Sequence, residues 1–456
     1  MFWKELTTGI YPWDIHDEGM ETILDNLQGL AGNNAAYMLA LMHHEKRPLH
    51  TNVYPHNPVR TRYLAEDSRC YFTIHPEEYR ASRIKPLQSD RDFLRGTDWL
   101  EVFIRALRKR GMQTGAEISH TPLDSGRGQT EFSDCLQRNV YGNPPEYGRF
   151  TFQQMCWNSP DAREYVCSLA RDLVRHYDLD MLQTCSFLYN PGRLDLHPFL
   201  GVVLGGCFCD NCRREAEKQG LDFEAMKRAA RFWADILLSE NTESQGLAFE
   251  TDAQPSVTRS TEDLLERGEA RLLLKQGNST STMFLLEQPA LYEWLQFRCR
   301  TVTRYFRELS GAIHQANPKV DFRFNTCWQE QELIGQNLRE IAPYVDSVRM
   351  MDYSEQYGDP ARMANKGPWL ANVRRQVGWD KPIIAGIAPR AKATPELIKQ
   401  GIRTVALGGA DGLSYGFYDG ASYANLRAIR EGMAEVGAEL HPTHCACHGK
   451  EEGCSC

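Results

Sequence analysis

The sequence predicts a (β/α)8 barrel, and two observations carry this prediction. Short apolar segments recur along the chain and precede helical patterns, which is how parallel strands and their crossover helices look in sequence. Eight such units can be placed, the number that closes a barrel, and a chain of 456 residues fits one elaborated barrel. A doubly wound open sheet gives a similar alternation and stays the alternative fold.

The eight units occupy most of the chain. The predicted strands span residues 6–13, 34–43, 112–120, 179–189, 320–328, 347–355, 381–389 and 410–420. Long insertions near residues 45–96 and 239–282 interrupt the pattern, the first as a substrate-covering loop or a purely structural excursion. We therefore expect a barrel over residues 1–440 and a Cys/His-rich tail over 441–456.

Composition and charge narrow the class of protein. Hydrophobic residues make up 42% and charged residues 25%, as in a protein with a large buried core. The formal charge of -8 lacks the basic footprint of a nucleic-acid binder, so we expect no nucleic-acid partner. No apolar run is long enough for a membrane span and no signal peptide is visible, which predicts a cytoplasmic protein. Whether it forms a homo-oligomer stays open.

Cysteine spacing predicts a metal site. Fourteen cysteines are many for a cytoplasmic protein, whose thiols stay reduced, so metal binding is favoured over disulfides. The segment GGCFCDNC places Cys207, Cys209 and Cys212 within six residues, and Cys156 just before a helix start is the best fourth ligand for a tetrahedral ion. The tail has a second set of residues that can bind zinc or another soft metal, with a flexible, oxidation-prone tail as the alternative: Cys445, Cys447, Cys454, Cys456, His441, His444 and His448.

A cysteine before an Asn-Ser-Pro helix start, then a strand, then C-x-C-x-x-C resembles the zinc site of family 42 β-galactosidases. It also resembles related hypothetical, family-10-like glycosyl hydrolases. The resemblance implies a glycoside hydrolase barrel and a structural zinc held by these four cysteines. In those enzymes an Asn-Glu pair ends strand 4 and a glutamate ends strand 7; here neither strand ends in a carboxylate.

Because active sites of barrels form at the carboxyl ends of the strands, we searched those ends for functional side chains. Aromatic rings beside hydrogen-bonding groups suit a sugar, so carbohydrate is the predicted ligand. The predicted substrate-binding residues are Trp13, Asp14, His16, His43, His120, Asn325, Trp328, Tyr353, Arg390 and Tyr415.

Glycosidic cleavage normally needs two carboxyl groups, one as the acid and one ionised. Five carboxylates lie near predicted strand ends: Asp14, Glu117, Asp352, Glu355 and Asp419. We select Asp352 and Glu117 as catalytic residues, with Glu355 of the same MMDYSE segment as the third. Each has the alternative reading of a carboxylate that pairs with a nearby cation and shapes the pocket.

Two other functions stay open. One is a metal-dependent sugar isomerase, epimerase or lyase, whose ion would be bound by the acidic and histidine residues of strands 1 to 3, Asp14, His16, His43, His44, Glu117 and His120. The other is a carbohydrate-binding barrel without catalysis, which the missing glutamates of strands 4 and 7 favour.

Overall fold

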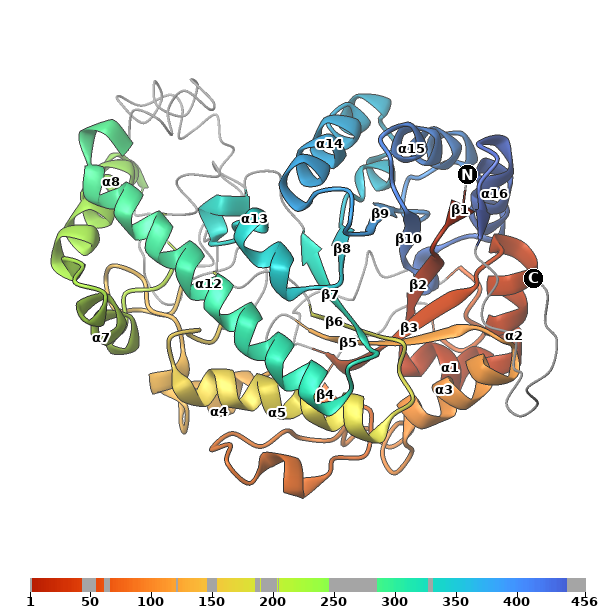
Figure 1. The fold of residues 1–456 in the computed structure, drawn as a ribbon, viewed down its shortest axis with the longest axis horizontal. Coiled ribbons are helices and arrows are strands. Elements are labelled where there is room, and N and C mark those ends of the chain that lie inside the picture. Colours follow the sequence, from red (N-terminus) through yellow and green to blue (C-terminus); the bar gives the residue numbers. More distant parts are fainter. Residues whose placement is uncertain are drawn as a thin grey trace.

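The fold is a (β/α)8 barrel, as predicted. The computed structural model describes residues 2–42, 55–60, 66–119, 122–145, 154–184, 189, 203, 205–245, 285–326 and 331–440, with the backbone alone for 236–245. Eight parallel strands form the barrel (Figure 1): β2 Leu6–Ile10, β3 Ala35–Met42, β5 Gln113–Ile118, β6 Met181–Thr184, β7 Asp321–Thr326, β8 Ser347–Met350, β9 Ile383–Ile387 and β10 Gly412–Phe417. Because β2 pairs with both β3 and β10, the sheet is closed and the open-sheet alternative is wrong.

Each barrel strand matches one predicted segment, usually shortened at its carboxyl end. Short strands lie outside the barrel: β1 Phe2–Trp3 pairs with β11 Glu439–Leu440, and β4 Arg69–Cys70 pairs antiparallel with β3. The β4 pairing belongs to the first insertion, whose described part also contains the turn η3 Pro76–Tyr79. Most of the second predicted insertion and the whole tail 441–456 lie outside the described residues.

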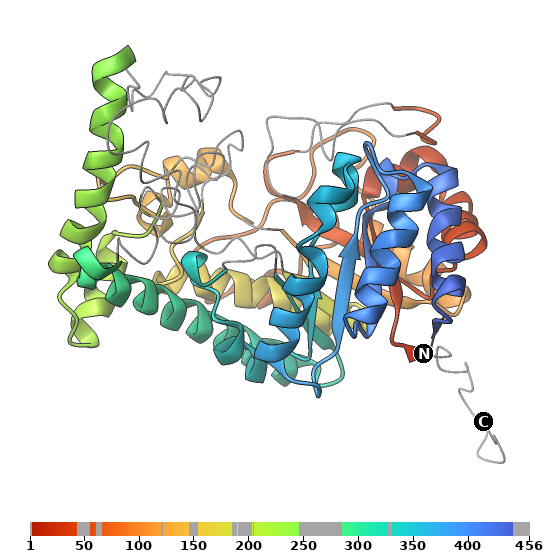
Figure 2. The same cartoon turned by 90° about the horizontal axis from the view of Figure 1, so that it is seen from above.

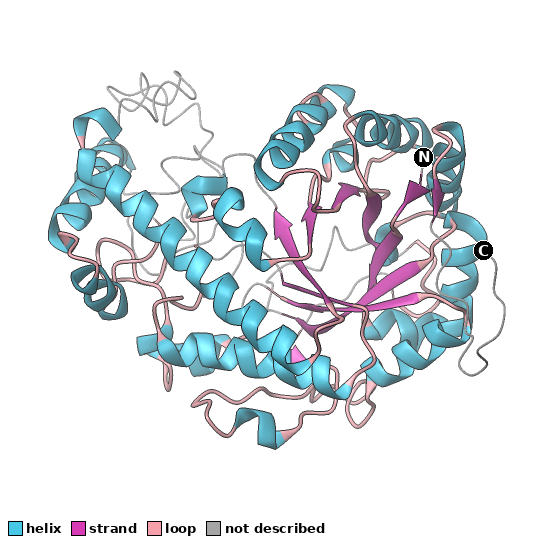
Figure 3. Cartoon of the chain, in the orientation of Figure 1, coloured by secondary structure: helices cyan, strands magenta, loops and turns pink. Residues whose placement is uncertain are grey.

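Helices surround the strands (Figure 3). Their bounds are α1 Pro12–Glu18, α2 Met20–Asp25, α3 Trp99–Lys109, α4 Ser125–Gln129, α5 Pro160–His176, α7 Asp210–Lys218, α8 Phe223–Gln245, α12 Pro289–Ala316, α13 Leu338–Ile341, α14 Lys366–Val377, α15 Pro395–Leu407 and α16 Tyr423–Glu435. Helices α7 and α8 stand beside the barrel near the amino end of α12 (Figure 2). No described helix has the length and apolarity that a membrane crossing requires.

Local sequence signals explain where the helix α5 begins. Ser159 is its N-cap, its hydroxyl accepts a hydrogen bond from the backbone N–H of Ala162, and Pro160 occupies the first turn. Cys156 lies three residues before this N-cap. The turn that begins α5 therefore also places one predicted metal ligand near the start of the helix. The sequence signal for the helix and that for the metal ligand therefore coincide.

A network of charged side chains fills the amino-terminal end of the barrel interior. Arg323 of β7 is fully buried and donates to both oxygens of Glu5, to Asp321 and to the hydroxyl of Ser347. Ser347 in turn donates to Asp321 over 2.6 Å, and Lys4 pairs with the same carboxylate. The arginine and lysine charges hold the pKa of Asp321 well below its usual range. This end of the barrel is a closed ion-pair network.

Candidate active site and candidate metal centre

The four predicted cysteines come together in the structure. The Sγ atoms of Cys156, Cys207, Cys209 and Cys212 all lie within 4.8 Å of one another. Two of these distances are 3.6 Å, for Cys156 to Cys212, and 3.3 Å, for Cys209 to Cys156. Sulfur atoms at the corners of a tetrahedron around zinc lie about 3.8 Å apart, given a Zn–S bond of about 2.3 Å. The cluster therefore has the size and donor set of a metal centre.

Neighbouring groups hold this cluster in place. The side-chain amide of Asn158 donates to Cys212 Sγ over 3.3 Å, and the backbone N–H of Arg138 donates to Cys207 Sγ over 3.4 Å. Burial raises the pKa of Cys156 and Cys212, whereas hydrogen bonds from the other cysteines lower the pKa of Cys209. The Asn158 amide and the Arg138 backbone N–H both donate to sulfur, and such hydrogen bonds stabilise thiolate ligands.

Glu117 lies at the carboxyl end of the barrel interior. It stands on β5 opposite Gln183 of β6, whose side-chain amide donates to the carboxylate. Arg349 of β8 reaches the same carboxylate from across the barrel, with Nη1 3.5 Å from Oε2, and its Nη2 donates to the hydroxyl of Tyr353 over 2.8 Å. Only 4% of Glu117 is exposed. An arginine at this distance favours the ionised carboxylate.

Asp352 and Glu355 share one buried cation. Lys366 Nζ lies 3.3 Å from Asp352 Oδ1 and 2.9 Å from Glu355 Oε1. Glu355 is fully buried, its second oxygen accepts from the backbone N–H of Ala388, and burial raises its pKa although Lys366 opposes the shift. The backbone N–H of Ser354 donates to Asp352. These two predicted catalytic residues therefore form one ion-pair group separate from Glu117.

A second pair of carboxyl groups lies where β2 and β10 end. Asp14 of α1 and Asp419, which follows β10, are both buried, and burial together with the charge of Asp419 raises the pKa of Asp14 well above its usual value. Burial raises the pKa of Asp419 to about 7, against the opposing charges of Arg390 and His56. Among the described residues, neither carboxylate oxygen of Asp419 bonds another side chain, while a hydrogen bond from the backbone N–H of Gly420 opposes the rise of its pKa. Such a carboxyl group suits a proton donor at neutral pH.

Three of the other predicted substrate-binding residues lie at the carboxyl end of the barrel. Arg390 follows β9, donates to Gln356, and lies 5.3 Å from the ring centre of Tyr353. Asn325 of β7 is fully buried, and neither end of its side-chain amide finds a hydrogen-bond partner among the described residues. The structure thus brings Asn325, Tyr353 and Arg390 to the same end of the barrel as Glu117 and Asp419.

The remaining described residues of the set have other contacts. Trp13 is buried and stacks on Tyr11 at 4.4 Å, and His16 contacts Asp17 on the more exposed side of α1. The hydroxyl of Tyr415 donates over 2.6 Å to Asn33, which precedes β3, so the structure does not bring this ring to Glu117. His43, His120 and Trp328 lie outside the described residues.

Sequence reasoning missed two cations that organise the site. Arg349 is an arginine inside an otherwise apolar strand, SVRMM, and such a charge in a buried strand is a signal that could have been used. Lys366 lies at the start of α14, where the sequence gives no sign that the side chain turns inward to Asp352 and Glu355. Arg349 forms an ion pair with Glu117, and Lys366 forms ion pairs with Asp352 and Glu355.

The described histidine and carboxylate residues of strands 1 to 3 do not form a second metal cluster. Asp14, His16 and Glu117 belong to none of the described groups whose ligand atoms lie within 4.8 Å of one another. Besides the cysteines, such groups are His75 with Asp172 and His176, and Asp134 with Cys135 and Asp161. The isomerase alternative would need ligands from the histidines outside the described residues.

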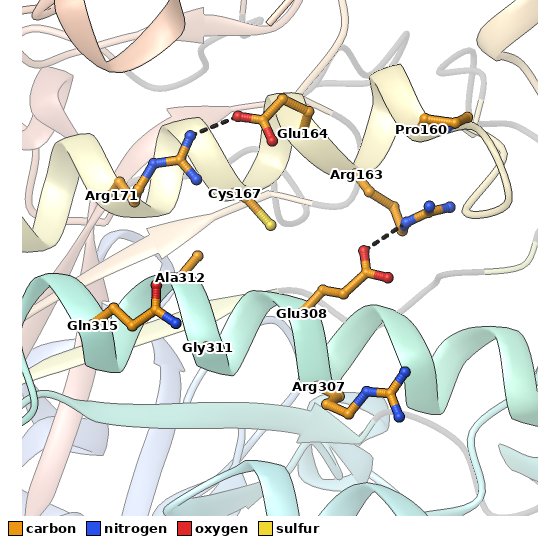
Figure 4. A pocket seen from close by; sticks show the side chains of 10 residues that line it. All are labelled: Pro160, Arg163, Glu164, Cys167, Arg171, Arg307, Glu308, Gly311, Ala312 and Gln315. Carbon is orange, nitrogen blue, oxygen red and sulfur yellow. Dashed lines mark hydrogen bonds and ion pairs between the residues drawn. The ribbon is translucent and has the colours of Figure 1, made fainter. Parts of the chain in front are cut away.

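A groove of about 650 Å³ lies on the outside of the barrel, between α5 and α12 (Figure 4). One ion pair crosses it, from Arg163 of α5 to Glu308 of α12, and another, between Arg171 and Glu164, lies along α5. It is lined by side chains of two outer helices and by none of the strand-end residues described above. We therefore do not assign the active site to this groove.

Comparison with known proteins shows the fold. No protein-family model and no curated protein matches the sequence. Among solved structures, the chain is similar to a β-galactosidase from Bacillus circulans sp. alkalophilus, with 15% identity, a TM-score of 0.54 and coverage of 96% of this chain and 56% of that one. It is also similar to α-L-fucosidase isoenzyme 2 from Paenibacillus thiaminolyticus, with 14% identity, a TM-score of 0.53 and coverage of 96% and 49%. The chain thus spans about half the length of these barrel proteins.

Proposed function

We propose that this chain is a glycoside hydrolase-like enzyme that binds a carbohydrate at the carboxyl end of its barrel. One observation carries the proposal. Glu117, which contacts Arg349 and Gln183, lies at the same end of the barrel as Asn325 and Asp419, two buried side chains whose polar atoms can accept further hydrogen bonds. Sugar hydroxyls need such donors and acceptors. The barrel likeness to proteins named β-galactosidase and α-L-fucosidase supports the same class by analogy.

In this proposal the two carboxyl roles go to groups with opposite environments. Glu117, beside an arginine, is the ionised carboxylate that acts as base or nucleophile. Asp419, buried and with a pKa of about 7, is the protonated group that donates to the leaving oxygen. The sequence predicts Asp352 and Glu355 as catalytic residues without assigning either one as acid or base, and these roles stay predictions beside their contact with Lys366.

Hydrolysis of a panel of aryl glycosides tests the function. We expect turnover of at least one glycoside, loss of it in Glu117→Gln and Asp419→Asn, and retention in a variant of the opposite barrel end, Glu5→Gln. If Asp352→Asn abolishes turnover and Asp419→Asn does not, the acid is Asp352. If calorimetry detects sugar binding and no glycoside is turned over, the result would instead support a carbohydrate-binding barrel. If a chelator abolishes activity and the protein binds a second metal ion besides the one at the cysteines, the result would support the metal-dependent isomerase.

We further propose that Cys156, Cys207, Cys209 and Cys212 hold a structural zinc. Four soft thiolates suit this ion, and a site with four protein ligands leaves no position for substrate. Bound zinc would tie the start of α5 to the start of α7 and stabilise the fold. Elemental analysis of protein purified without chelator is expected to give one zinc per chain, and a value near zero would refute the assignment. The cytoplasmic location remains a prediction.

A further inference from the structure

Arg298 of α12 is a buried cation without a hydrogen-bond partner in the described part of the chain. None of its side chain is exposed, and its Nε, Nη1 and Nη2 all lack a hydrogen-bond partner among the residues that the structure describes. Burial lowers the pKa of Arg298 to about 10, so the side chain is still charged at neutral pH. An isolated buried charge is strongly destabilising, and therefore a compensating anion is expected nearby.

Aromatic rings place this guanidinium beside the cysteine cluster. It lies 4.5 Å from the ring centres of both Tyr189 and Trp294, in cation–π contact with each. Trp294 stacks on Phe208 at 4.7 Å, and Phe208 is the residue between Cys207 and Cys209. Negative charge on Cys207 or Cys212 would stabilise the charged form of Arg298. The stack thus joins Arg298 to the loop that carries three of the four sulfur atoms.

The charge of a loaded site is opposite in sign to this cation, which neutralises part of it. Four thiolates around a divalent ion carry a net charge of about −2. The other arginines near the cluster are engaged: Arg304 pairs with Glu215, Arg213 pairs with Glu224, and the Arg138 side chain donates to a backbone carbonyl. Within the described residues, Arg298 is the cation near the cluster that lacks an anionic partner.

We propose that Arg298 balances the charge of the four-cysteine centre and raises its affinity for a divalent, thiol-preferring cation. The inference rests on the metal site proposed above and assigns a role to a residue that does not touch the ion. In the metal-free protein no anionic group among the described residues bonds the guanidinium, and in the loaded protein it has an anionic neighbour. Arg298 therefore favours the loaded state from both sides of the equilibrium.

The same face of α12 positions a ligand through hydrogen bonds. Thr301, three residues after Arg298, donates to Asn158 Oδ1 over 3.3 Å, and Arg304 donates to the same oxygen over 2.5 Å. Asn158 then presents its amide N–H to Cys212 Sγ. Residues three and four apart share one helix face, so α12 supplies both the charge and the orienting bonds of the centre.

The test compares two variants of Arg298 with a matched control. Arg298→Met removes the charge and keeps much of the volume, and Arg298→Lys keeps the charge. Arg300→Met, on the same helix, removes an exposed arginine that bonds Gln219. Zinc affinity is measured on the full chain by competition with a chromophoric chelator, and melting temperature is measured with and without chelator. Loss of an outer-shell partner lowers metal affinity by about 10- to 100-fold, which is expected for Arg298→Met.

Retained affinity is expected for Arg298→Lys and Arg300→Met. Without metal, Arg298→Met is expected to melt at the same temperature as the parent or higher, because an unpaired buried charge is gone. The inference is overturned if Arg298→Met binds zinc as tightly as the parent protein and loses the same stability with and without metal. Arg298 would then be a packing residue. If Arg298→Met is not recovered folded, Arg298→Gln serves the same comparison. Absence of zinc from the parent protein would refute the metal site itself.

Discussion

Two residues of β7, two positions apart and therefore on the same face of the strand, have opposite surroundings. Arg323, at the amino-terminal end of the barrel interior, is bonded by Glu5, Asp321 and Ser347. Asn325, toward the carboxyl end, has no bond from either end of its amide to any described residue. Both are fully buried. The strand thus places a satisfied and an unsatisfied polar group in one interior.

The contrast separates stability from function within one barrel. Buried polar groups are normally hydrogen-bonded, so a group without partners needs an explanation. At the amino-terminal end the described side chains of Arg323, Glu5, Asp321 and Ser347 bond one another. At the carboxyl end Asn325 and Asp419 hold donors and acceptors that a bound molecule could satisfy. Barrel enzymes use these two ends in the same way.

The largest expected effect is on activity at the carboxyl end. Glu117→Gln removes the negative charge beside Arg349 and leaves the size of the side chain unchanged. Because general acid–base and nucleophilic groups contribute about 100- to 10,000-fold, we expect kcat/KM on the best glycoside to fall by that factor. A melting temperature close to the parent's would show that the loss is chemical. Full activity in a folded Glu117→Gln variant would contradict the assignment.

The equivalent substitution at the other end should affect stability instead. Glu5→Gln removes the carboxylate that accepts hydrogen bonds from Nη1 and Nη2 of Arg323, so a buried guanidinium loses its main anionic partner. Breaking a buried pair from one side costs about 3 kcal/mol, which urea unfolding can measure. The kcat of the folded fraction should match that of the parent. A loss of kcat larger than the loss of folded protein would break the division between the two ends.

Asp419 predicts a pH dependence with a defined sign. Its pKa rises from about 3.9 in the unfolded chain to about 7 in the folded protein. The native state therefore binds the proton more tightly, and its contribution to stability is full below about pH 4 and lost as pH rises through about 7. We expect melting temperatures of Asp419→Asn to depend less on pH between 5 and 7.5 than those of the parent. Glycoside turnover by the parent should fall above pH 7.

Identical slopes of melting temperature against pH in Asp419→Asn and the parent would show that Asp419 does not titrate there. Asp14 is a useful comparison, because burial and the charge of Asp419 raise its pKa as well. Removing Asp419 should therefore bring the pKa of Asp14 closer to its usual value. Stability of the double variant, Asp14→Asn with Asp419→Asn, is expected to be nearly independent of pH over this range if the two carboxyls account for the effect.

The sequence was sufficient for the scaffold and for the cysteines. Apolar alternation is a local property, so each barrel strand could be placed before its partners were known. The spacing of Cys207, Cys209 and Cys212 is also local, and a capping turn marked Cys156. The roles of carboxylates at the carboxyl end are not local. Glu117 meets Arg349 across 232 positions of sequence, and no local pattern around either residue indicates that contact.

The same limit explains the position of Tyr415. Its place near the end of a predicted strand suggested a substrate contact, but strand residues alternate between two faces, and this one bonds Asn33. Lys366 is a residue whose role the local sequence does not indicate at all. Nothing in the segment NKGPWL indicates that the lysine turns inward to two carboxylates, because the pairing depends on how α14 packs on β8 and β9.

The smallest and sharpest prediction concerns Asn325. Replacing it with leucine removes an amide without partners in the described structure and adds an apolar side chain of similar volume. Burying an amide without hydrogen bonds costs about 1–3 kcal/mol in proteins, so stability should stay the same or rise by about 1 kcal/mol once some packing strain is allowed for. Because the amide is one of the groups proposed to bind sugar, affinity for the substrate or its analogue should fall.

A gain in melting temperature together with weaker sugar binding is the result expected of a binding residue whose partner is absent from the free protein. Threonine at position 326 offers a neighbouring control, since its hydroxyl is already bonded to Gln331 and its replacement by valine should lower stability without changing sugar affinity. A strong loss of stability in Asn325→Leu would mean that the amide has partners of its own, such as ordered water, and that the two ends of β7 are equally satisfied.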